Sequence, residues 1–205
     1  ESHAERLATL AGVDSADTVI EVGTGLGALT RALASRASRV VTVEVDAGLV
    51  RVLEIEGLLP DNVELLHADA RRVDFAALAA SAPGSCRLVA NLPYSVATPL
   101  LRQCLDLGDS LVGWSVMVQR EVGARLLAET GSRDYGSLSV LHRLCVEVQL
   151  CTQLGGQRFY SAAKVRSSFL RMTPLRARQV DRDELCEVER LVRCAFGQRR
   201  KMLGN

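Results

Sequence analysis

Short runs of β-branched and aliphatic residues alternate with amphipathic stretches along the first two-thirds of the chain. This alternation is typical of a parallel sheet whose strands are joined by crossover helices. It predicts strands over 18–22, 39–45, 63–67, 87–91 and 113–119, and helices over 28–35, 47–57, 75–80 and 98–107. We expect Pro99 in the first turn of its helix, where a missing N–H costs nothing.

The pattern changes after Gln119. It predicts a helix over 121–129, a polar loop over 131–136, and two strands over 146–154 and 165–172, the second ending before Pro174. From residue 176 the sequence is helical and charged, with 8 basic and 5 acidic residues. We therefore predict an α/β domain over residues 1–175 and the start of a small helical domain over 176–205.

Composition narrows the class of protein. The 205 residues are 48% hydrophobic and 24% charged, which excludes a disordered or low-complexity chain. The formal charge is +1, so any nucleic-acid surface must be a local patch. No apolar run is long enough for a membrane helix, and we expect a cytoplasmic protein without a membrane partner. The six cysteines have neither C-x-x-C spacing nor a histidine at zinc-ligand spacing, so we expect no metal site.

A glycine-rich loop runs from Glu21 to Ala28, where a strand should end and a helix begin. Glycines such as Gly23 and Gly25 let the backbone turn tightly and approach a ligand, and the helix start offers free N–H groups. Glu44 lies 21 residues after Gly23, where an acid that binds a ribose is expected. The loop therefore predicts a nucleotide-type cofactor site.

Four residues follow the ends of successive predicted strands: Gly23, Glu44, Asp69 and Asn91. In an open α/β sheet those ends line the ligand crevice. Glu44 can accept both hydroxyls of a ribose, and Asp69 can accept from an adenine amino group. Glu21 would repel a pyrophosphate but attract the amino and sulfonium groups of S-adenosylmethionine. The acids therefore favour S-adenosylmethionine over NAD.

The segment Asn91-Leu92-Pro93-Tyr94 follows the fourth strand, beside the expected cofactor site. An exocyclic amine on a base is a poor nucleophile, because its lone pair is delocalised into the ring. The Asn91 side-chain oxygen and a backbone carbonyl next to Pro93 can accept its two hydrogens and aim the lone pair at a methyl group. Tyr94 can stack on a base held out of its helix.

Three segments in order, NLPYSVATPLL (91–101), GSRDYGSLSV (131–140) and AFGQRRKML (195–203), resemble the small-subunit (16S) ribosomal RNA adenine dimethyltransferases of the KsgA type, in the rRNA adenine N(6)-methyltransferase family. The resemblance implies a Rossmann-like methyltransferase sheet, S-adenosylmethionine as methyl donor and no metal. It also implies two adjacent adenines of small-subunit RNA as acceptors, each methylated twice, and a pre-30S particle as partner. We expect the protein to act as a monomer.

The same resemblance assigns roles by position. The cofactor residues it implies, with those of the glycine loop, are Glu21, Gly23, Gly25, Glu44, Asp69 and Asn91. The target-amine residues are Asn91, Leu92 and Tyr94, and Phe159 matches the aromatic that holds the base from the other side. The basic run 199–201 suits RNA phosphates.

The sequence departs from the family at two places. After Phe159 the family has a proline-punctuated segment, whereas residues 160–167 here contain no proline, so the placement of Phe159 is less constrained. Nothing like the family's Gln-Asn-Phe-Leu segment precedes Leu7, and the family's helical domain would continue past Asn205. Either the sequence is a piece of a longer protein, which we expect, or this homologue binds its cofactor more openly.

Three other functions stay open from the sequence. An Erm-type methyltransferase of large-subunit RNA, which confers antibiotic resistance, shares the fold and the Asn-x-Pro-Tyr site. A non-catalytic ribosome assembly factor would keep the fold and bind RNA, although the intact segment from Asn91 to Tyr94 argues against it. NAD-dependent oxidoreduction is disfavoured by Glu21.

Overall fold

The computed structural model describes residues 2–92, 94–155, 166–177 and 180–197, and for Tyr94, Ser95 and Arg182 it describes the backbone alone. Seven strands form one sheet: β1 (Thr18–Val22), β2 (Arg39–Glu44), β3 (Val63–His67), β4 (Cys86–Asn91), β5 (Gly113–Gln119), β6 (Val146–Leu154) and β7 (Ser167–Pro174). The helices are α1 (His3–Leu10), α2 (Ala28–Ala34), α3 (Ala47–Ile55), α4 (Phe75–Ala80), α5 (Tyr94–Leu107), α6 (Arg120–Leu127), α7 (Ser137–Cys145) and α8 (Arg182–Gly197), with short 3-10 turns at Ala70–Arg72 and Gly108–Ser110.

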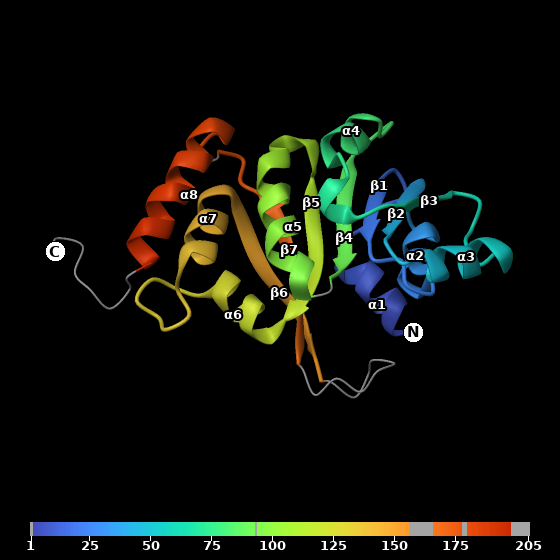
Figure 1. Ribbon diagram of the computed structural model, residues 1–205, viewed down its shortest axis with the longest axis horizontal. Coiled ribbons are helices and arrows are strands. Elements are labelled where there is room, and N and C mark those ends of the chain that lie inside the picture. Colours follow the sequence, from blue (N-terminus) through green and yellow to red (C-terminus); the bar gives the residue numbers. More distant parts are fainter. Residues whose placement is uncertain (1, 93, 156–165, 178–179, 198–205) are drawn as a thin grey trace.

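The strand order is β3-β2-β1-β4-β5-β7-β6 (Figure 1). Strands β1 to β5 run parallel to one another, whereas β7 pairs antiparallel with both β5 and β6. The chain moves outward from β1 to β3 and then returns to place β4 on the other side of β1. The order therefore reverses between β1 and β4, and the carboxyl ends of these two strands flank the crevice in which such sheets bind ligands.

Helices cover both faces of the sheet, because the buried parallel strands are apolar on both sides. On one face, Phe75 of α4 and Leu101 of α5 pack on β-strand residues such as Leu88 and Val116. On the other face, α1 and α2 contribute a second cluster, to which Leu33 belongs. The sheet is thus the middle layer of three and holds its strand ends in fixed positions.

The structure confirms the five parallel strands predicted from the pattern, with ends that differ by at most one residue. The expectation for Pro99 was wrong, because α5 begins at Tyr94 and Pro99 lies inside it. Because α5 begins four residues before the predicted start, the missing N–H of Pro99 lies about one turn further into the helix than predicted. Strand β7 also runs through Pro174, which pairs with Val146 at the end of both strands, where a missing N–H is tolerated.

Helix α8 is attached to the sheet domain by apolar and ionic contacts. Leu185 is fully buried in the main core cluster. The Arg102 side chain of α5 donates from Nε to Glu189 of α8 at 2.6 Å and forms an ion pair with Asp106. Within the described residues, no helix is long and apolar enough to cross a membrane.

Candidate active site

The glycine loop after β1 lies directly against the end of β4. Gly23 has φ +90°, a conformation that favours glycine, and a Cβ atom there would lie 3.1 Å from the Asn91 carbonyl oxygen. Its N–H donates to the Val43 carbonyl of β2 at 2.9 Å, which fixes the first turn of the loop. The absence of a side chain at position 23 therefore brings the loop and Asn91 together at the point where the strand order reverses.

Glu44, the last residue of β2, has both carboxylate oxygens held by backbone donors. Oε2 accepts from the N–H of Gly25 at 2.9 Å, and Oε1 accepts from the N–H groups of Val45 at 2.9 Å and Asp46 at 3.0 Å. The side chain is buried, with 7% of the residue exposed. These bonds fix the carboxylate and tie it to the glycine loop, and Oε2, which has a single donor, keeps acceptor capacity for a ligand hydroxyl.

Glu21 is fully buried beneath this loop, with no exposed surface. Its Oε2 accepts from the hydroxyls of Thr30 and Thr42, each at 2.6 Å. The Thr42 oxygen also lies 2.7 Å from the Thr24 hydroxyl. Since Thr42 gives its only proton to Glu21, Thr24 must donate to Thr42. The hydroxyls therefore form a directed chain, from Thr24 on the loop through Thr42 to Glu21.

The second oxygen of Glu21, Oε1, is buried and has no hydrogen-bond partner among the described residues. Burial, with a smaller contribution from the charge of Glu44, raises the pKa of Glu21 to about 7, against the hydroxyl bonds from Thr30 and Thr42 that lower it. A buried oxygen without a partner is costly, and a cationic donor would satisfy it. The carboxylate oxygens of Glu21 and Glu44 are acceptors, and together they fit a ligand that carries an ammonium group and vicinal hydroxyls.

Asp69 lies on the rim, after β3, and is held by a residue that the sequence did not single out. Its carboxylate accepts from Arg71 Nε at 3.0 Å and from Arg71 Nη2 at 2.6 Å, and also from the Arg71 backbone N–H at 3.0 Å. These bonds lower the pKa of Asp69 to about 2. Asp69 is thus ionised, and it shares its acceptor capacity with Arg71.

The target-amine residues are described in part. Asn91 is exposed at the end of β4, whereas Leu92 is buried and donates its backbone N–H to the Met117 carbonyl of β5 at 3.3 Å. Tyr94 begins α5. Phe159 and residues 199–201 lie outside the described residues. The structure therefore brings Gly23, Glu44 and Asn91 to one place, with Glu21 beneath them.

Sequence reasoning missed the threonines that organise Glu21. Thr42 lies two residues before Glu44 on the same strand, so both face the same side of the sheet, and this period-2 spacing was the available signal. Thr30 lies on the first turn of α2, and only the fold places it over Glu21. Across the parts of the chain that the structure covers, no group of three or more His, Cys, Asp or Glu side chains could hold a metal ion.

Known proteins resemble this chain over most of its length. A family model described as ribosomal RNA adenine dimethylase matches residues 1–205. The chain is 37% identical over 204 residues to ribosomal RNA small subunit methyltransferase A of Magnetococcus marinus, covering 100% of this chain and 73% of that protein. It is 39% identical over 207 residues to the protein of the same name from Moorella thermoacetica, covering 98% and 72%.

Solved structures share the fold. A dimethyladenosine transferase from Plasmodium falciparum superposes with a TM-score of 0.82 at 25% identity, over 98% of this chain and 70% of that one. The 23S rRNA methyltransferase ErmE has a TM-score of 0.77 at 23% identity, over 97% and 78%, and supports the fold alone. The chain belongs to the ribosomal RNA adenine dimethylase family.

Proposed function

We propose that this protein transfers methyl groups from S-adenosylmethionine to the exocyclic N6 of two adjacent adenines in small-subunit ribosomal RNA. Each adenine is methylated twice, on a pre-30S particle in the cytoplasm, as a step in small-subunit maturation. The observation that carries the proposal is the close approach of Gly23 to the Asn91 carbonyl, which sets the cofactor loop against the Asn-Leu-Pro-Tyr segment. The names of the bacterial relatives support small-subunit RNA as the substrate.

In this proposal, residues of the glycine loop and of the neighbouring strand ends hold the cofactor. Gly23 and Gly25 give it room, Glu44 accepts the two ribose hydroxyls, and Asp69 accepts from the adenine amino group. Glu21 supplies a negative charge under the loop, and its Oε1 is the acceptor left for the ammonium group. S-adenosylmethionine supplies a methyl group on a cationic sulfur, which is a strong electrophile without a metal ion.

Asn91 and Leu92 orient the target amine. The Asn91 side-chain oxygen and the Leu92 carbonyl accept the two hydrogens of the amine, which draws the nitrogen toward a tetrahedral shape and points its lone pair at the methyl group. Tyr94 and Phe159 hold the base between them. Catalysis then rests on position and alignment of the reacting atoms, and it needs no strongly basic side chain.

The chain divides between sheet and helical parts in this proposal. Residues 1–175 form the methyltransferase domain and residues 176–205 begin a helical domain. The boundary falls between β7, which ends at Pro174, and α8, which begins at Arg182. We infer that the protein works as a monomer.

The decisive experiment measures labelled methyl transfer from S-adenosylmethionine to under-methylated small subunits, with the product base identified by mass spectrometry. Dimethyladenine is expected. Isolated large subunits serve as the parallel substrate, since transfer to them instead would favour the Erm-type function. Asn91→Ala should abolish transfer and keep the urea midpoint, because the Asn91 side chain is exposed. Near-normal turnover by this variant would contradict the mechanism, and no transfer by the wild type would favour an assembly factor.

A further inference from the structure

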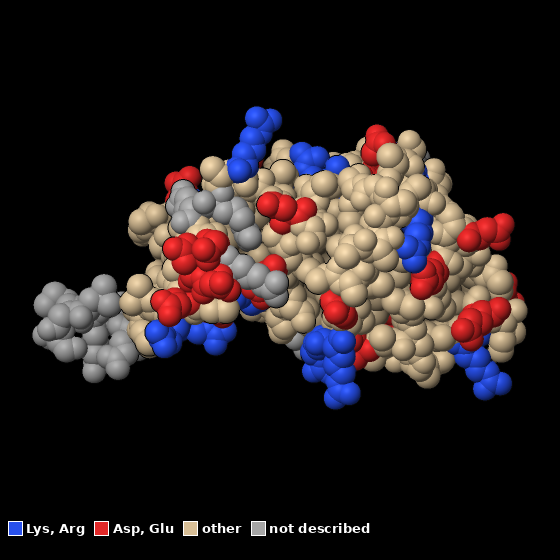
Figure 2. All heavy atoms as spheres, turned by 90° about the horizontal axis from the view of Figure 1, so that it is seen from above, with Lys and Arg blue, Asp and Glu red and all other residues tan. Residues whose placement is uncertain are grey.

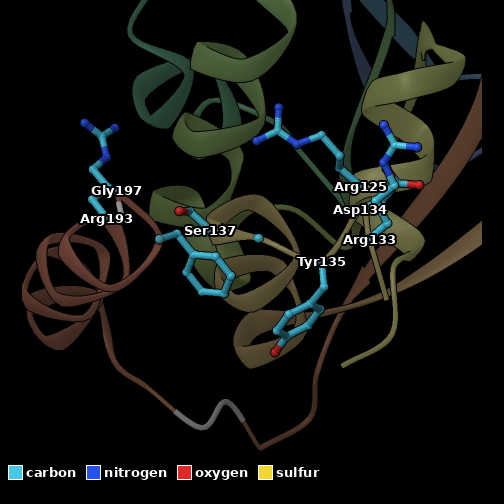
Figure 3. Close-up of a pocket in the computed structure, with 9 residues that line it drawn as sticks. Arg125, Arg133, Asp134, Tyr135, Ser137, Arg193 and Gly197 are labelled. Carbon is cyan, nitrogen blue, oxygen red and sulfur yellow. The ribbon is translucent and has the colours of Figure 1, made fainter. Parts of the chain in front are cut away.

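Two adjoining cavities lie away from the glycine loop, between the sheet domain and α8. The first, of about 410 Å³, is bounded by Arg125 of α6, by the loop 133–136 before α7, and by the end of α8. The second, of about 440 Å³, extends along α5 and α7, and the two share Arg125, Ser137 and Arg193. In Figure 3, Arg193 projects from α8 on one side of the view and Arg125 on the other, with Ser137 between them. Both volumes lie in the range of sites that bind nucleotide-sized ligands.

Positive charge predominates around these cavities. Their walls include four arginines and two acids: Arg102, Arg125, Arg133, Arg193, Asp134 and Glu189. The Arg102 charge is offset by Asp106 and Glu189, and Glu189 also forms an ion pair with Arg193 at 2.6 Å, so two arginines share this one acid. Arg125 is exposed and forms no ion pair within the described part of the chain. A guanidinium without an acidic partner beside a cavity is a ready partner for a phosphate group.

Two aromatic rings complete the first cavity. Tyr135 and Phe196 are half-buried, with ring centroids 6.0 Å apart and an interplanar angle of 62°. Their edge-to-face contact holds the two rings against each other in the wall of the cavity. Unpaired bases bind proteins by stacking on aromatic rings beside a cationic groove, with little dependence on sequence. Phosphate-binding and base-binding groups thus occur in one cavity.

The charges along α8 are sorted toward this site. Acidic residues occupy its first half, from Asp183 to Glu189, whereas Arg190 and Arg193 lie in its second half. Figure 1 shows α8 beginning near the edge with the amino ends of the parallel strands and running toward the opposite edge, where α6 and the loop before α7 lie. Figure 2 shows the amino-end edge, where acidic side chains crowd over α8. The arginines therefore lie toward the edge that carries Asn91.

Helix α5 connects the cavities to the proposed active site. It begins at Tyr94, and Thr98 and Pro99 line the second cavity. Four residues of helix rise by about 6 Å, so this cavity starts one turn from the segment that would hold the target adenine. An RNA strand that delivers an adenine to Asn91 would pass the cavities with its neighbouring nucleotides.

We propose that the paired cavities bind one unpaired nucleotide of the RNA substrate other than the reacting adenine, with its phosphate between Arg125 and Arg193 and its base on the rings of Tyr135 and Phe196. This inference rests on the proposed function. The second cavity adds no titrating positive charge in this range, since burial lowers the pKa of His142 in its wall to about 4. Binding should therefore be constant between pH 6 and pH 8.

The test measures binding of a fluorescein-labelled single-stranded RNA of about eight nucleotides by anisotropy, over a range of salt concentrations. The variants are Arg125→Gln and Arg193→Gln, with Arg51→Gln as the matched control. Arg51 is exposed on α3, at the far end of the molecule (Figure 1). Each cavity variant should weaken binding severalfold at low salt. Each should also lower the slope of log affinity against log salt by about 0.7, the value for one lost phosphate contact on a single strand.

A second variant tests the base contact. Phe196→Leu should weaken binding severalfold and leave the salt slope unchanged, because it removes a stacking surface and no charge. Equal loss of affinity in Arg51→Gln and the cavity variants would overturn the proposal, because binding would then be a diffuse attraction. Unchanged affinity in Phe196→Leu would overturn the base contact.

The proposed function can fail or stand separately from this site. Methyl transfer to small subunits and binding of the short RNA are measured on the same preparation of wild-type protein. Wild-type protein that methylates small subunits but does not bind the RNA at low salt would refute the nucleotide site alone, and would favour a protein partner for the cavities. Wild-type protein that binds the RNA but transfers no methyl group to small subunits would refute the proposed function alone.

Discussion

Replacement of Glu21 by glutamine should change how the stability of the protein depends on pH. Glutamine keeps an oxygen that can accept from Thr30 and Thr42, but it carries no titrating group. Glu21 is fully buried, and burial raises its pKa from 4.5 to about 7. The folded state therefore binds this proton more tightly than the unfolded state does. The stability contribution of Glu21 is complete below pH 4.5 and is lost as the pH rises toward 7.

The size of the effect follows from those two values. The gap between 4.5 and about 7 corresponds to about 3 kcal/mol, of which roughly 2.5 kcal/mol falls between pH 5 and pH 8. The buried amide of the variant has its own cost, on the order of 1–3 kcal/mol, because its NH₂ group lacks a partner. That cost does not change with pH. The difference between variant and wild type should therefore shift in favour of the variant by roughly 2.5 kcal/mol from pH 5 to pH 8.

The assay is urea unfolding of both proteins at several pH values between 4.5 and 8.5. Glu54→Gln is the matched control, since Glu54 is exposed on α3 and its replacement should leave the pH profile unchanged. Parallel profiles for Glu21→Gln and the wild type would refute the reasoning, because Glu21 would then not titrate in this range. Calorimetric titration with S-adenosylmethionine should show weaker binding by Glu21→Gln at pH 8, since the variant lacks the charge proposed to attract the ammonium group.

Three further changes probe other contacts. Gly23→Ala should destabilise the protein by about 1–3 kcal/mol in urea unfolding and reduce methyl transfer, because φ is +90° and the new Cβ would press on the Asn91 carbonyl. Gly25→Ala is the comparison, since the space around that glycine is open. A loss of stability in Gly23→Ala no larger than in Gly25→Ala would count against the contact. Arg87→Met should lower the free energy of unfolding by about 3 kcal/mol at pH 7, because it removes the cation paired with the buried Asp17. The pKa of Asp17 is lowered in the folded state, so this loss should become smaller as acid protonates Asp17. Asp69→Asn should weaken S-adenosylmethionine binding severalfold in the same calorimetry, and unchanged binding would remove Asp69 from the cofactor site.

The parallel half of the fold could be predicted from the sequence because its signal is local. Each strand is a short apolar run between turn residues, and the pattern located β1 and β5 to the residue. Helix α7 was not predicted, since its residues follow a polar loop and its buried face is defined by packing against α8 and β6. The position of Pro99 in its helix could not be predicted for a similar reason, because the start of α5 depends on where β4 ends.

The candidate site was predictable at the strand ends and less so around them. Gly23, Glu44 and Asn91 follow from the rule that carboxyl ends of parallel strands share one edge. The partner of Asp69 lies only two residues along the chain, but the pattern gave no reason to pair it with Arg71. The burial of Glu21 could not be read from the sequence, because it depends on how α2 and its Thr30 cover the end of β1.

Two buried acids, Asp17 and Glu21, affect folding in opposite ways when they ionise, and they lie at opposite edges of the sheet. Asp17, at the amino-end edge, receives hydrogen bonds from Ser85, the Asp14 N–H and Arg87, and its lowered pKa means that ionisation favours folding. Glu21, at the carboxyl-end edge, has one oxygen without a partner, and its raised pKa means that ionisation opposes folding by about 3 kcal/mol. Native domains have only roughly 5–15 kcal/mol of net stability, so this opposition is a large share of what a domain has. A carboxylate kept at that cost is expected where a ligand completes its contacts, and the loop above it belongs to the cofactor site that we propose.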